Sequence, residues 1–279
     1  MEIRRSEKAG IHITSIKGQD LPIEAEKNVA GVAGLAILKA HNAQLGFEIR
    51  IEKNIKPGSG IGSSAASAAG TVAGINYLLG NPFTNKELIP FAMEGERLGC
   101  GSAHADNVAP ALLGGFTLVR DTNPLDICAL PTPLELVATV IHPKIEVKTA
   151  DARAVLKKRV TLEKAISQWG NVGALVSSLY EEDYDLLSRS LVDGIVEPAR
   201  SILIPYFKEL KAACIEGGAL GSGISGSGPS VFALSRGMST ANKVAQAMQS
   251  VLEETNIPFD IHVSPVKKTG VSFIEDLLT

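Results

Sequence analysis

The chain has 279 residues, of which 45% are apolar and 20% are charged, and its formal net charge is −3. These values fit a compact protein of one large or two ordinary domains and exclude a largely disordered chain. Because no run of basic residues is longer than Lys157, Lys158 and Arg159, the electrostatic footprint of a nucleic-acid-binding protein is missing.

Two segments of the N-terminal half alternate apolar and polar residues, as half-buried strands do. They are residues 10–16 and 46–55, and the second places Phe47, Ile49 and Ile51 on one face. We therefore predict two strands that bury one side.

Three helices are predicted around these strands. The first covers residues 26–42, and the second is an alanine-rich helix over residues 63–79. The third follows the N-cap candidate Thr84, and Pro90 should kink or split it.

Proline density rises at residues 128–134, where a new strand begins. We place the domain boundary there, with an N-terminal domain of residues 1–131 and a C-terminal domain of residues 132–279. The elements expected after it are helices over residues 149–217, a glycine-serine loop at 221–230, the strand "VFAL", a helix over 239–256, and strands at 259–263 and 270–274. Strands on both sides of helix blocks indicate an α+β fold with two lobes.

The stretch "KPGSGIGSSAASAAG" is dense in glycine and serine just before the second predicted helix. Glycine at this density usually lets something approach the backbone closely. The spacing does not match a Walker A loop, a nucleophile elbow or a dinucleotide fingerprint. A phosphate cradle of another type remains, in which backbone N–H groups and the positive helix end hold the anion while Ser63 and Ser64 add hydroxyl donors or a metal contact. The alternative is a tight turn between strand and helix.

The cysteines and the distribution of apolar residues indicate the cellular compartment of the protein. Cys100, Cys128 and Cys214 lie far apart and no C-x-x-C pair occurs, so the sequence suggests neither a disulfide framework nor a zinc site. The first residues lack an apolar signal core, and no stretch approaches the roughly 20 apolar residues of a membrane span. We expect a cytoplasmic protein with no membrane or nucleic-acid partner.

Three stretches, "PGSGIGSSAAS", "EGERLGCGSAHADNVAPALLGGFTLV" and "GSGISGSGPSVFAL", in this order and at this separation resemble the GHMP small-molecule kinases. Within that family, "GSAHADNVAP" followed by "GG" and "KTADARAVL" is most similar to the homoserine kinase branch. The resemblance implies ATP-dependent phosphorylation of the hydroxyl of L-homoserine, in threonine biosynthesis. It also implies an N-terminal lobe similar to ribosomal protein S5 domain 2 and a ferredoxin-like C-terminal lobe.

The same resemblance implies an ATP and Mg²⁺ side of the site. Asn28 matches an asparagine near the adenine, and N-capping explains it equally well. Glu96 would coordinate Mg²⁺ with help from Ser63 or Ser64, the alternative being a solvated glutamate on a helix. The second glycine-serine loop should support the first. The ATP loop itself would consist of Lys56, Pro57, Gly58, Ser59, Gly60, Ile61, Gly62, Ser63, Ser64, Ala65 and Ala66.

On the acceptor side, the resemblance implies catalytic roles for His104, Asp106 and Asn107. The counterpart of Asn107 sits at the acceptor hydroxyl, and other GHMP kinases use an aspartate near the place of Asp106 as a base. A primary hydroxyl can lose its proton late in a loose transition state, so we expect these residues to position the acceptor first. The structural alternative is that Asp106 caps the next segment and His104 packs.

The carboxylate of homoserine calls for the planar fork of arginine. Arg153 and Arg200 match the carboxylate pair of the family, and Thr149 is expected beside them. These arginines favour an acceptor with a carboxylate, but they do not separate homoserine from shikimate. A GHMP kinase for another small alcohol therefore stays open as an alternative.

The pattern departs from the homoserine kinases at the N-terminus. Members normally open with a strand and a "PASSAN…GFD"-like motif, whose Asn and Asp are expected to hold the substrate ammonium, and this motif is not found here. We therefore expect weakened or absent activity for this chain. An alternative function, that of a protein that binds nucleotide without catalysing a reaction, therefore stays open. We also expect a homodimer, and this expectation rests on the family resemblance alone.

Overall fold

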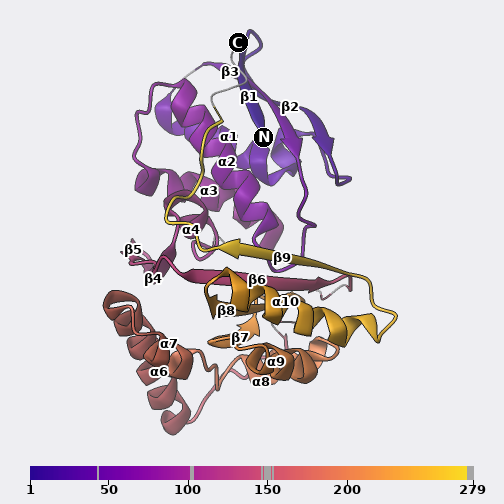
Figure 1. The fold of residues 1–279 in the computed structure, drawn as a ribbon. Coiled ribbons are helices and arrows are strands. Elements are labelled where there is room, and N and C mark those ends of the chain that lie inside the picture. Colours follow the sequence, from indigo (N-terminus) through magenta and orange to yellow (C-terminus); the bar gives the residue numbers. More distant parts are fainter. Residues whose placement is uncertain (43, 101–103, 146, 148–151, 153, 275–279) are drawn as a thin grey trace. The chain divides into compact units, whose positions relative to one another are not determined.

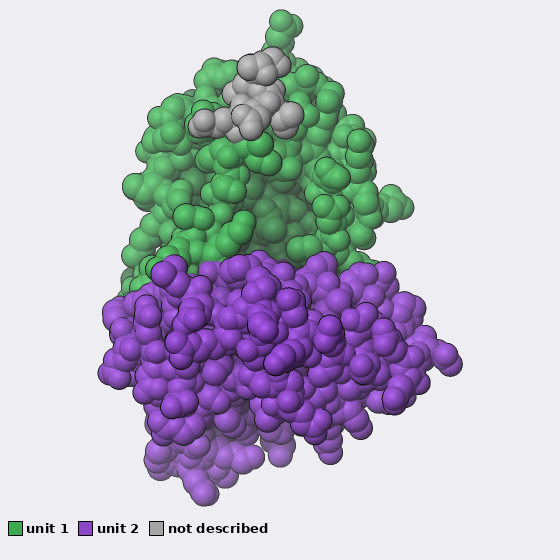
Figure 2. Space-filling model, in the orientation of Figure 1, with its two compact units in different colours: residues 1–57, 62–129, 267–279 green, residues 58–61, 130–266 purple. Residues whose placement is uncertain are grey.

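The computed structural model describes residues 1–42, 44–100, 104–145, 147, 152 and 154–274. The chain forms two compact units (Figure 2), of which unit 1 is Met1–Pro57, Gly62–Ala129 and Lys267–Thr279, and unit 2 is Gly58–Ile61 and Leu130–Val266. The units are defined by spatial contact, so the chain changes from one unit to the other at both ends of the segment Gly58–Ile61, after Ala129 and after Val266. The functional domain limits, 1–131 and 132–279, stay a prediction.

A three-stranded sheet in the order β1-β3-β2 forms one layer of unit 1. Its strands are β1 (Glu2–Ser6), β2 (Gly10–Lys17) and β3 (Gly46–Glu52), and β3 pairs antiparallel with β1 and parallel with β2. The alternating face of β3 is buried, which confirms the two predicted strands. β1 was not predicted, because its sequence EIRRS carries one apolar side chain and its pairing depends on β3.

Helices α1 (Val29–His41), α2 (Ser63–Leu78) and α3 (Asn85–Cys100) pack on one another beside this sheet (Figure 1), and the short α4 (Val108–Leu113) contacts α2 and α3. A 3-10 turn, η1 (Ala25–Lys27), leads into α1. A Cβ on Gly95 of α3 would lie 2.5 Å from the Val29 carbonyl oxygen, so α1 and α3 approach closely only with glycine there. Small residues thus let these helices interlock.

Pro90 lies inside α3 without dividing it, so the predicted split is wrong. The residue is exposed, and its ring therefore meets no core packing. A proline in this position removes one intrahelical hydrogen bond, and the neighbouring turns of α3 still continue the helix. Leu88, Ile89 and Ala92, which flank Pro90 in sequence, are fully buried and fix the helix on the core of unit 1.

The end of the described chain returns to unit 1 beside the hairpin of β4 (Phe116–Thr122) and β5 (Leu125–Leu130). Gly115 N–H donates to the Lys267 carbonyl at 2.7 Å, and Phe273 stacks on Tyr77 with ring centroids 4.8 Å apart. No strand forms at 270–274, which corrects that prediction. A Cβ on Gly270 would lie 2.5 Å from the Leu112 carbonyl, so the segment packs on the end of a helix instead of a sheet edge.

Unit 2 contains a four-stranded antiparallel sheet in the order β7-β8-β6-β9. The strands are β6 (Leu136–Pro143), β7 (Gly221–Ile224), β8 (Val231–Arg236) and β9 (Phe259–Pro265), packed with α9 (Phe207–Glu216) and α10 (Met238–Glu253). This strand order confirms the predicted ferredoxin-like lobe. The glycine-serine loop is shorter than predicted, because its first four residues pair with β8 as β7.

The remaining helices of unit 2 lie between β6 and β7 in sequence. They are α6 (Leu162–Glu181), α7 (Tyr184–Ser190), α8 (Glu197–Arg200) and the 3-10 turn η2 (Ser201–Leu203). α6 and α7 pack together as a pair (Figure 1), and the side chains of Thr161 and Asp183 cap their N-termini. Among the described residues, no helix is long and apolar enough to cross a membrane.

Candidate active site

The first glycine loop leads into α2 with three glycines in left-handed conformations: Gly58, Gly60 and Gly62 have φ of 76°, 81° and 74°. Gly62 is the N-cap of α2, and the first intrahelical bond runs from Ala66 N–H to its carbonyl at 2.9 Å. The N–H groups of the first turn, at Ser63, Ser64 and Ala65, precede that bond and have no partner within the helix. The junction therefore presents amides and the positive helix end, as an anion site requires.

The second glycine-serine loop holds the tip of the first within unit 2. Ser225 Oγ donates to the Gly60 carbonyl at 2.8 Å, and Ser230 Oγ donates to the Ser59 carbonyl at 2.6 Å. A Cβ on Gly60 would lie 2.4 Å from the Ser225 carbonyl oxygen, so the backbones touch. These contacts confirm that the second loop supports the first.

A buried lysine stands behind the start of α2. Lys53 is 6% exposed, and its Nζ donates to the Ser63 carbonyl at 2.8 Å and to Ser67 Oγ at 2.6 Å. Ser63 in turn donates its hydroxyl to the Ile55 carbonyl at 2.6 Å. Burial lowers the pKa of Lys53, and the charge of Glu96 acts against that shift. Lys53 thus ties the strand that precedes the loop to the helix that follows it.

Glu96, on α3, is the buried acid of this region, with 4% of its surface exposed. Burial raises its pKa most, a hydrogen bond from Ser64 lowers it, and the charge of Asp106 raises it again. His104 and Lys53 lower it further. Within the described residues, Glu96 Oε1 has no hydrogen-bond partner. A buried carboxylate oxygen without a partner is costly, and a bound cation would satisfy it.

The predicted acceptor residues lie close to this acid in unit 1. His104 and Asp106 both interact electrostatically with Glu96. Asn107 is the N-cap of α4 without a side-chain capping bond, and a Cβ on Gly62 would lie 3.6 Å from Asn107 Oδ1. The structure therefore brings Glu96, His104, Asp106, Asn107 and the start of α2 together.

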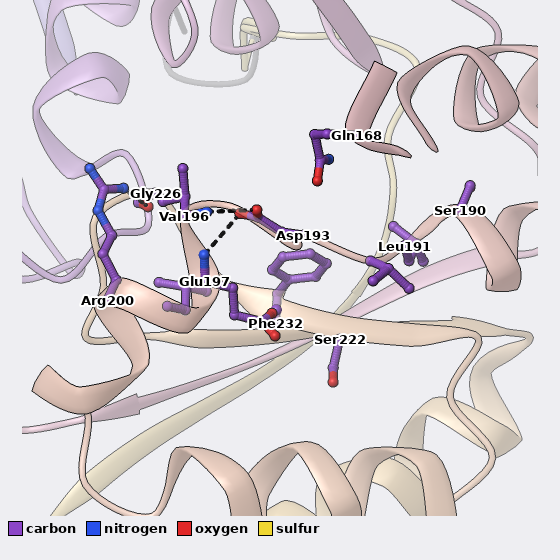
Figure 3. A pocket seen from close by; sticks show the side chains of 13 residues that line it. Gln168, Ser190, Leu191, Asp193, Val196, Glu197, Arg200, Ser222, Gly226 and Phe232 are labelled. Atoms are coloured by element: carbon purple, nitrogen blue, oxygen red, sulfur yellow. Dashed lines mark hydrogen bonds between the residues drawn. The ribbon is translucent and has the colours of Figure 1, made fainter. Parts of the chain in front are cut away.

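Arg200 lies in unit 2, at the end of α8. Its guanidinium donates to the Ala152 carbonyl at 3.1 Å and to the Gly226 carbonyl at 3.2 Å. It lines a cavity of about 210 Å³ whose wall also includes Asp193, Glu197 and Phe232 (Figure 3). In that view the Asp193 carboxylate accepts backbone N–H groups at the start of α8, while Arg200 points to Gly226.

Three other predicted residues have different outcomes. Thr149 and Arg153, expected at the substrate carboxylate, lie outside the described residues. Asn28 caps α1: its Oδ1 accepts from Ala30 N–H at 3.0 Å and its Nδ2 donates to the Pro22 carbonyl at 2.7 Å. Both ends of the Asn28 side chain are used locally, and a contact with adenine stays a prediction.

Lys53 is the residue that sequence reasoning missed. Its signal was the period of β3: after Phe47, Ile49 and Ile51, the next position on the buried face is residue 53. A lysine at a core-facing position is rare unless it is paired. The predicted strand over residues 46–55 already contained Lys53, so following its alternation past Ile51 would have placed this lysine on the buried face.

The donor set near α2 fits a magnesium ion better than a zinc ion. Among the described residues, no three His, Cys, Asp or Glu side chains gather closely enough to hold a metal. Magnesium usually binds through one or two carboxylates together with substrate phosphates and water. Glu96, with its open oxygen and Ser64 beside it, offers that kind of incomplete site.

Comparisons with known proteins identify the family of this chain. The GHMP kinases N terminal domain matches residues 27–115, and the GHMP kinases C terminal domain matches residues 175–254. Homoserine kinase of Chlorobium phaeobacteroides (strain DSM 266) is 47% identical over 98% of this chain and 88% of its own length. The crystal structure of homoserine kinase from Cytophaga hutchinsonii has a TM-score of 0.92 and 52% identity, covering 96% of this chain and 86% of that one.

A more distant solved structure shares the fold alone. The crystal structure of L. major mevalonate kinase in complex with R-mevalonate has a TM-score of 0.70 at 16% identity, over 95% of this chain and 85% of that one. At this identity the likeness carries no argument about the acceptor molecule.

Proposed function

The chain belongs to the homoserine kinases of the GHMP kinase family, and from this membership we propose that it transfers the terminal phosphoryl group of ATP to the side-chain hydroxyl of L-homoserine. The product is O-phospho-L-homoserine, an intermediate of threonine biosynthesis. The observation on which this proposal rests is the close similarity to homoserine kinases over nearly the whole chain. The cluster of polar and charged side chains around Glu96 supports this proposal.

We propose that the glycine loop binds the phosphates of ATP. Phosphoryl transfer depends on positioning and charge neutralisation more than on covalent chemistry. The left-handed glycines leave the backbone open, and the first amides of α2 point out of the helix toward an anion. The second loop and Lys53 hold this geometry before ATP binds, because they fix carbonyl groups on both sides of the junction.

Glu96, with Ser64 or Ser63, would hold Mg²⁺. When bound, the ion neutralises negative charge on the phosphate oxygens. Ser64 suits this role better than Ser63, because Ser63 already donates its hydroxyl to Ile55. Burial of Glu96 excludes water from the carboxylate and keeps it in one position.

Two groups of residues would hold the acceptor. His104, Asp106 and Asn107 orient the hydroxyl of homoserine, and Asp106 is the residue available to accept its proton. Arg200, together with Thr149 and Arg153, binds the carboxylate, for which a planar guanidinium is well suited. Support comes from the grouping of the first three residues around Glu96 and from the position of Arg200 at a cavity wall.

A coupled assay of ADP release tests the proposal. Purified chain with ATP and Mg²⁺ is offered L-homoserine, shikimate, mevalonate and L-serine, and ³¹P NMR identifies the product. We expect turnover with L-homoserine and the signal of a phosphate monoester at its hydroxyl. Turnover of another alcohol without L-homoserine would overturn the substrate assignment, and calorimetric ATP binding without any turnover would overturn the activity.

A cytoplasmic location and a homodimer are also proposals. The free thiols of Cys128 and Cys214 fit a reducing compartment. Fractionation of the host cells followed by immunoblotting checks the location.

A further inference from the structure

The segment that leads into α8 is fixed to α6 on both sides of Asp193. On one side, Asn171 Nδ2 donates to the Val192 carbonyl at 2.9 Å. On the other side, Gln168 Oε1 accepts the Gly194 N–H at 3.0 Å. Both side chains belong to α6, which has 20 residues. The backbone around Asp193 is therefore held by a long helix before the short helix α8 begins.

The Asp193 carboxylate in turn binds the start of α8. Its Oδ1 accepts the N–H groups of Ile195 and Val196, each at 2.8 Å. Its Oδ2 accepts the N–H of Glu197 at 3.1 Å, as Figure 3 shows. α8 has only four residues, and a helix of that length is unstable by itself in water. The negative charge of Asp193 and its three hydrogen bonds at the helix N-terminus therefore help to fix where α8 lies.

Arg200 is the last residue of α8, so its side chain starts from a backbone that Asp193 holds. Its own N–H donates to the Val196 carbonyl at 3.0 Å, one turn back along the helix. Its guanidinium donates to the carbonyls of Ala152 and Gly226. These bonds take two of the five N–H donors of a guanidinium, whose fork is rigid and planar. The direction of the other donors therefore follows from the place of α8 and from these two carbonyls.

We propose that Asp193 is a positioning residue for the acceptor, which holds Arg200, through α8, in the orientation that binds the carboxylate of L-homoserine. The inference rests on the proposed function, in which Arg200 binds that carboxylate. Asp193 acts through the helix and not by contact, because its own negative charge would repel the carboxylate of the substrate. Its removal should weaken binding of the acceptor and leave binding of ATP and the phosphoryl transfer step almost unchanged.

Steady-state kinetics of Asp193→Ala test this role. The KM for L-homoserine should rise about 5- to 20-fold, on the scale of one hydrogen bond. The KM for ATP and kcat at saturating L-homoserine should change by less than about 2-fold, as expected when only acceptor binding is lost. Asp193→Asn keeps an oxygen that accepts backbone N–H groups, so it should return the KM to within about 3-fold of the unchanged chain. An unchanged KM for L-homoserine in Asp193→Ala would overturn the proposal.

Asp183→Ala is the matched control for a merely structural effect. Asp183 caps α7 as Asp193 caps α8, since its Oδ1 accepts the Leu186 N–H at 2.9 Å, and α7 carries none of the predicted site residues. The control should lose stability in urea and keep its KM for L-homoserine, and an equal rise of KM in both alanine variants would overturn the proposal. Circular dichroism checks that each variant is folded. Should Asp193→Ala not fold, Asp193→Ser replaces it, because serine keeps one acceptor oxygen for the start of α8.

A double-mutant cycle shows whether Asp193 acts through Arg200. In an Arg200→Ala background, Asp193→Ala should raise the KM for L-homoserine by less than about 2-fold further, because the group that it positions is absent. An equal rise in both backgrounds would mean that Asp193 acts independently and would overturn the inference. Turnover of L-homoserine by the unchanged chain is measured first. Its absence would overturn the proposed function together with this inference, whereas the other contrary outcomes overturn the inference alone.

Discussion

Ser230 donates its hydroxyl to the carbonyl of Ser59 at 2.6 Å, across a sequence separation of 171 residues. His142 Nδ1 lies 3.1 Å from the same hydroxyl, which already donates its proton to Ser59 and so accepts there. Ser225 makes the parallel contact to Gly60. The first glycine loop is thus shaped by a distant part of the chain as well as by its own glycines.

Gly60→Ala should destabilise the protein by about 1–3 kcal/mol, because the new Cβ meets the Ser225 carbonyl and the residue keeps a positive φ. Gly58→Ala is the matched control: its φ is also positive, but its Cβ would meet nothing within 4 Å. Urea unfolding compares the two variants. Equal losses in free energy of unfolding would mean that backbone contact between the loops contributes nothing beyond the conformational strain.

Glu96→Gln should lower kcat by at least about 100-fold, on the scale of losing one electrostatic contact to the transition state. The neutral amide binds a divalent cation poorly, so the Mg²⁺ concentration needed for half activity should rise as well. Glu94→Gln serves as control, because Glu94 is exposed on the same helix and pairs with Arg97. Steady-state kinetics at varied Mg²⁺ measure both effects, and equal kcat in the two variants would remove Glu96 from the site.

The same substitution should stabilise the folded chain at neutral pH. The pKa of Glu96 is raised by burial above 4.5, so ionisation of this group costs stability above that value. The cost is relieved as the pH falls through the folded pKa. Glu96→Gln should therefore unfold at higher urea than the unchanged chain at pH 7, with the difference shrinking toward pH 4.5. A difference that grows on acidification would have the wrong sign for a buried carboxyl.

Lys53→Met should shift the pH dependence of kcat/KM. The positive charge of Lys53 lowers the pKa of Glu96, so its removal raises that pKa and moves the acid limb of the profile to higher pH. Lys39→Met, at an exposed position on α1, should leave the profile unchanged. A drop in kcat with an unmoved acid limb would mean that Lys53 supports the fold of the loop alone.

Arg200→Ala should raise the KM for L-homoserine about 10- to 100-fold, the equivalent of one charge-assisted hydrogen bond of about 1.5–3 kcal/mol. The KM for ATP should change little. Arg189→Ala, on the exposed side of α7, is the control. Initial rates at varied L-homoserine decide the matter, since an unchanged KM would remove Arg200 from the carboxylate site.

Most of the fold could be predicted from local patterns, and the exceptions share a cause. The helix at Ser63 and the strand over residues 46–52 follow from alanine content, glycine punctuation and alternation. β1 and the segment at 270–274 were misjudged because their structure depends on what lies beside them. β1 exists by pairing with β3, and Gly270 packs on α4 where no strand edge is available.

The candidate site divides in the same way. Glu96, His104, Asp106 and Asn107 were predicted from a resemblance, and the structure brings them together although the last three lie in the loop before α4. Lys53 is not part of the motifs that carry the family resemblance. It is buried, it donates to the Ser63 carbonyl, and its charge interacts with that of Glu96. Its burial becomes apparent when the alternation of the predicted strand, residues 46–55, is followed past Ile51.

A crystal structure of the chain with L-homoserine and a non-hydrolysable ATP analogue is the most direct test of the central claim, which is that the start of α2 binds the phosphates of ATP. We predict phosphate oxygens within hydrogen-bond distance of the backbone N–H groups of Ser63 and Ser64, and a metal ion on Glu96. A triphosphate bound away from these amides would contradict the account.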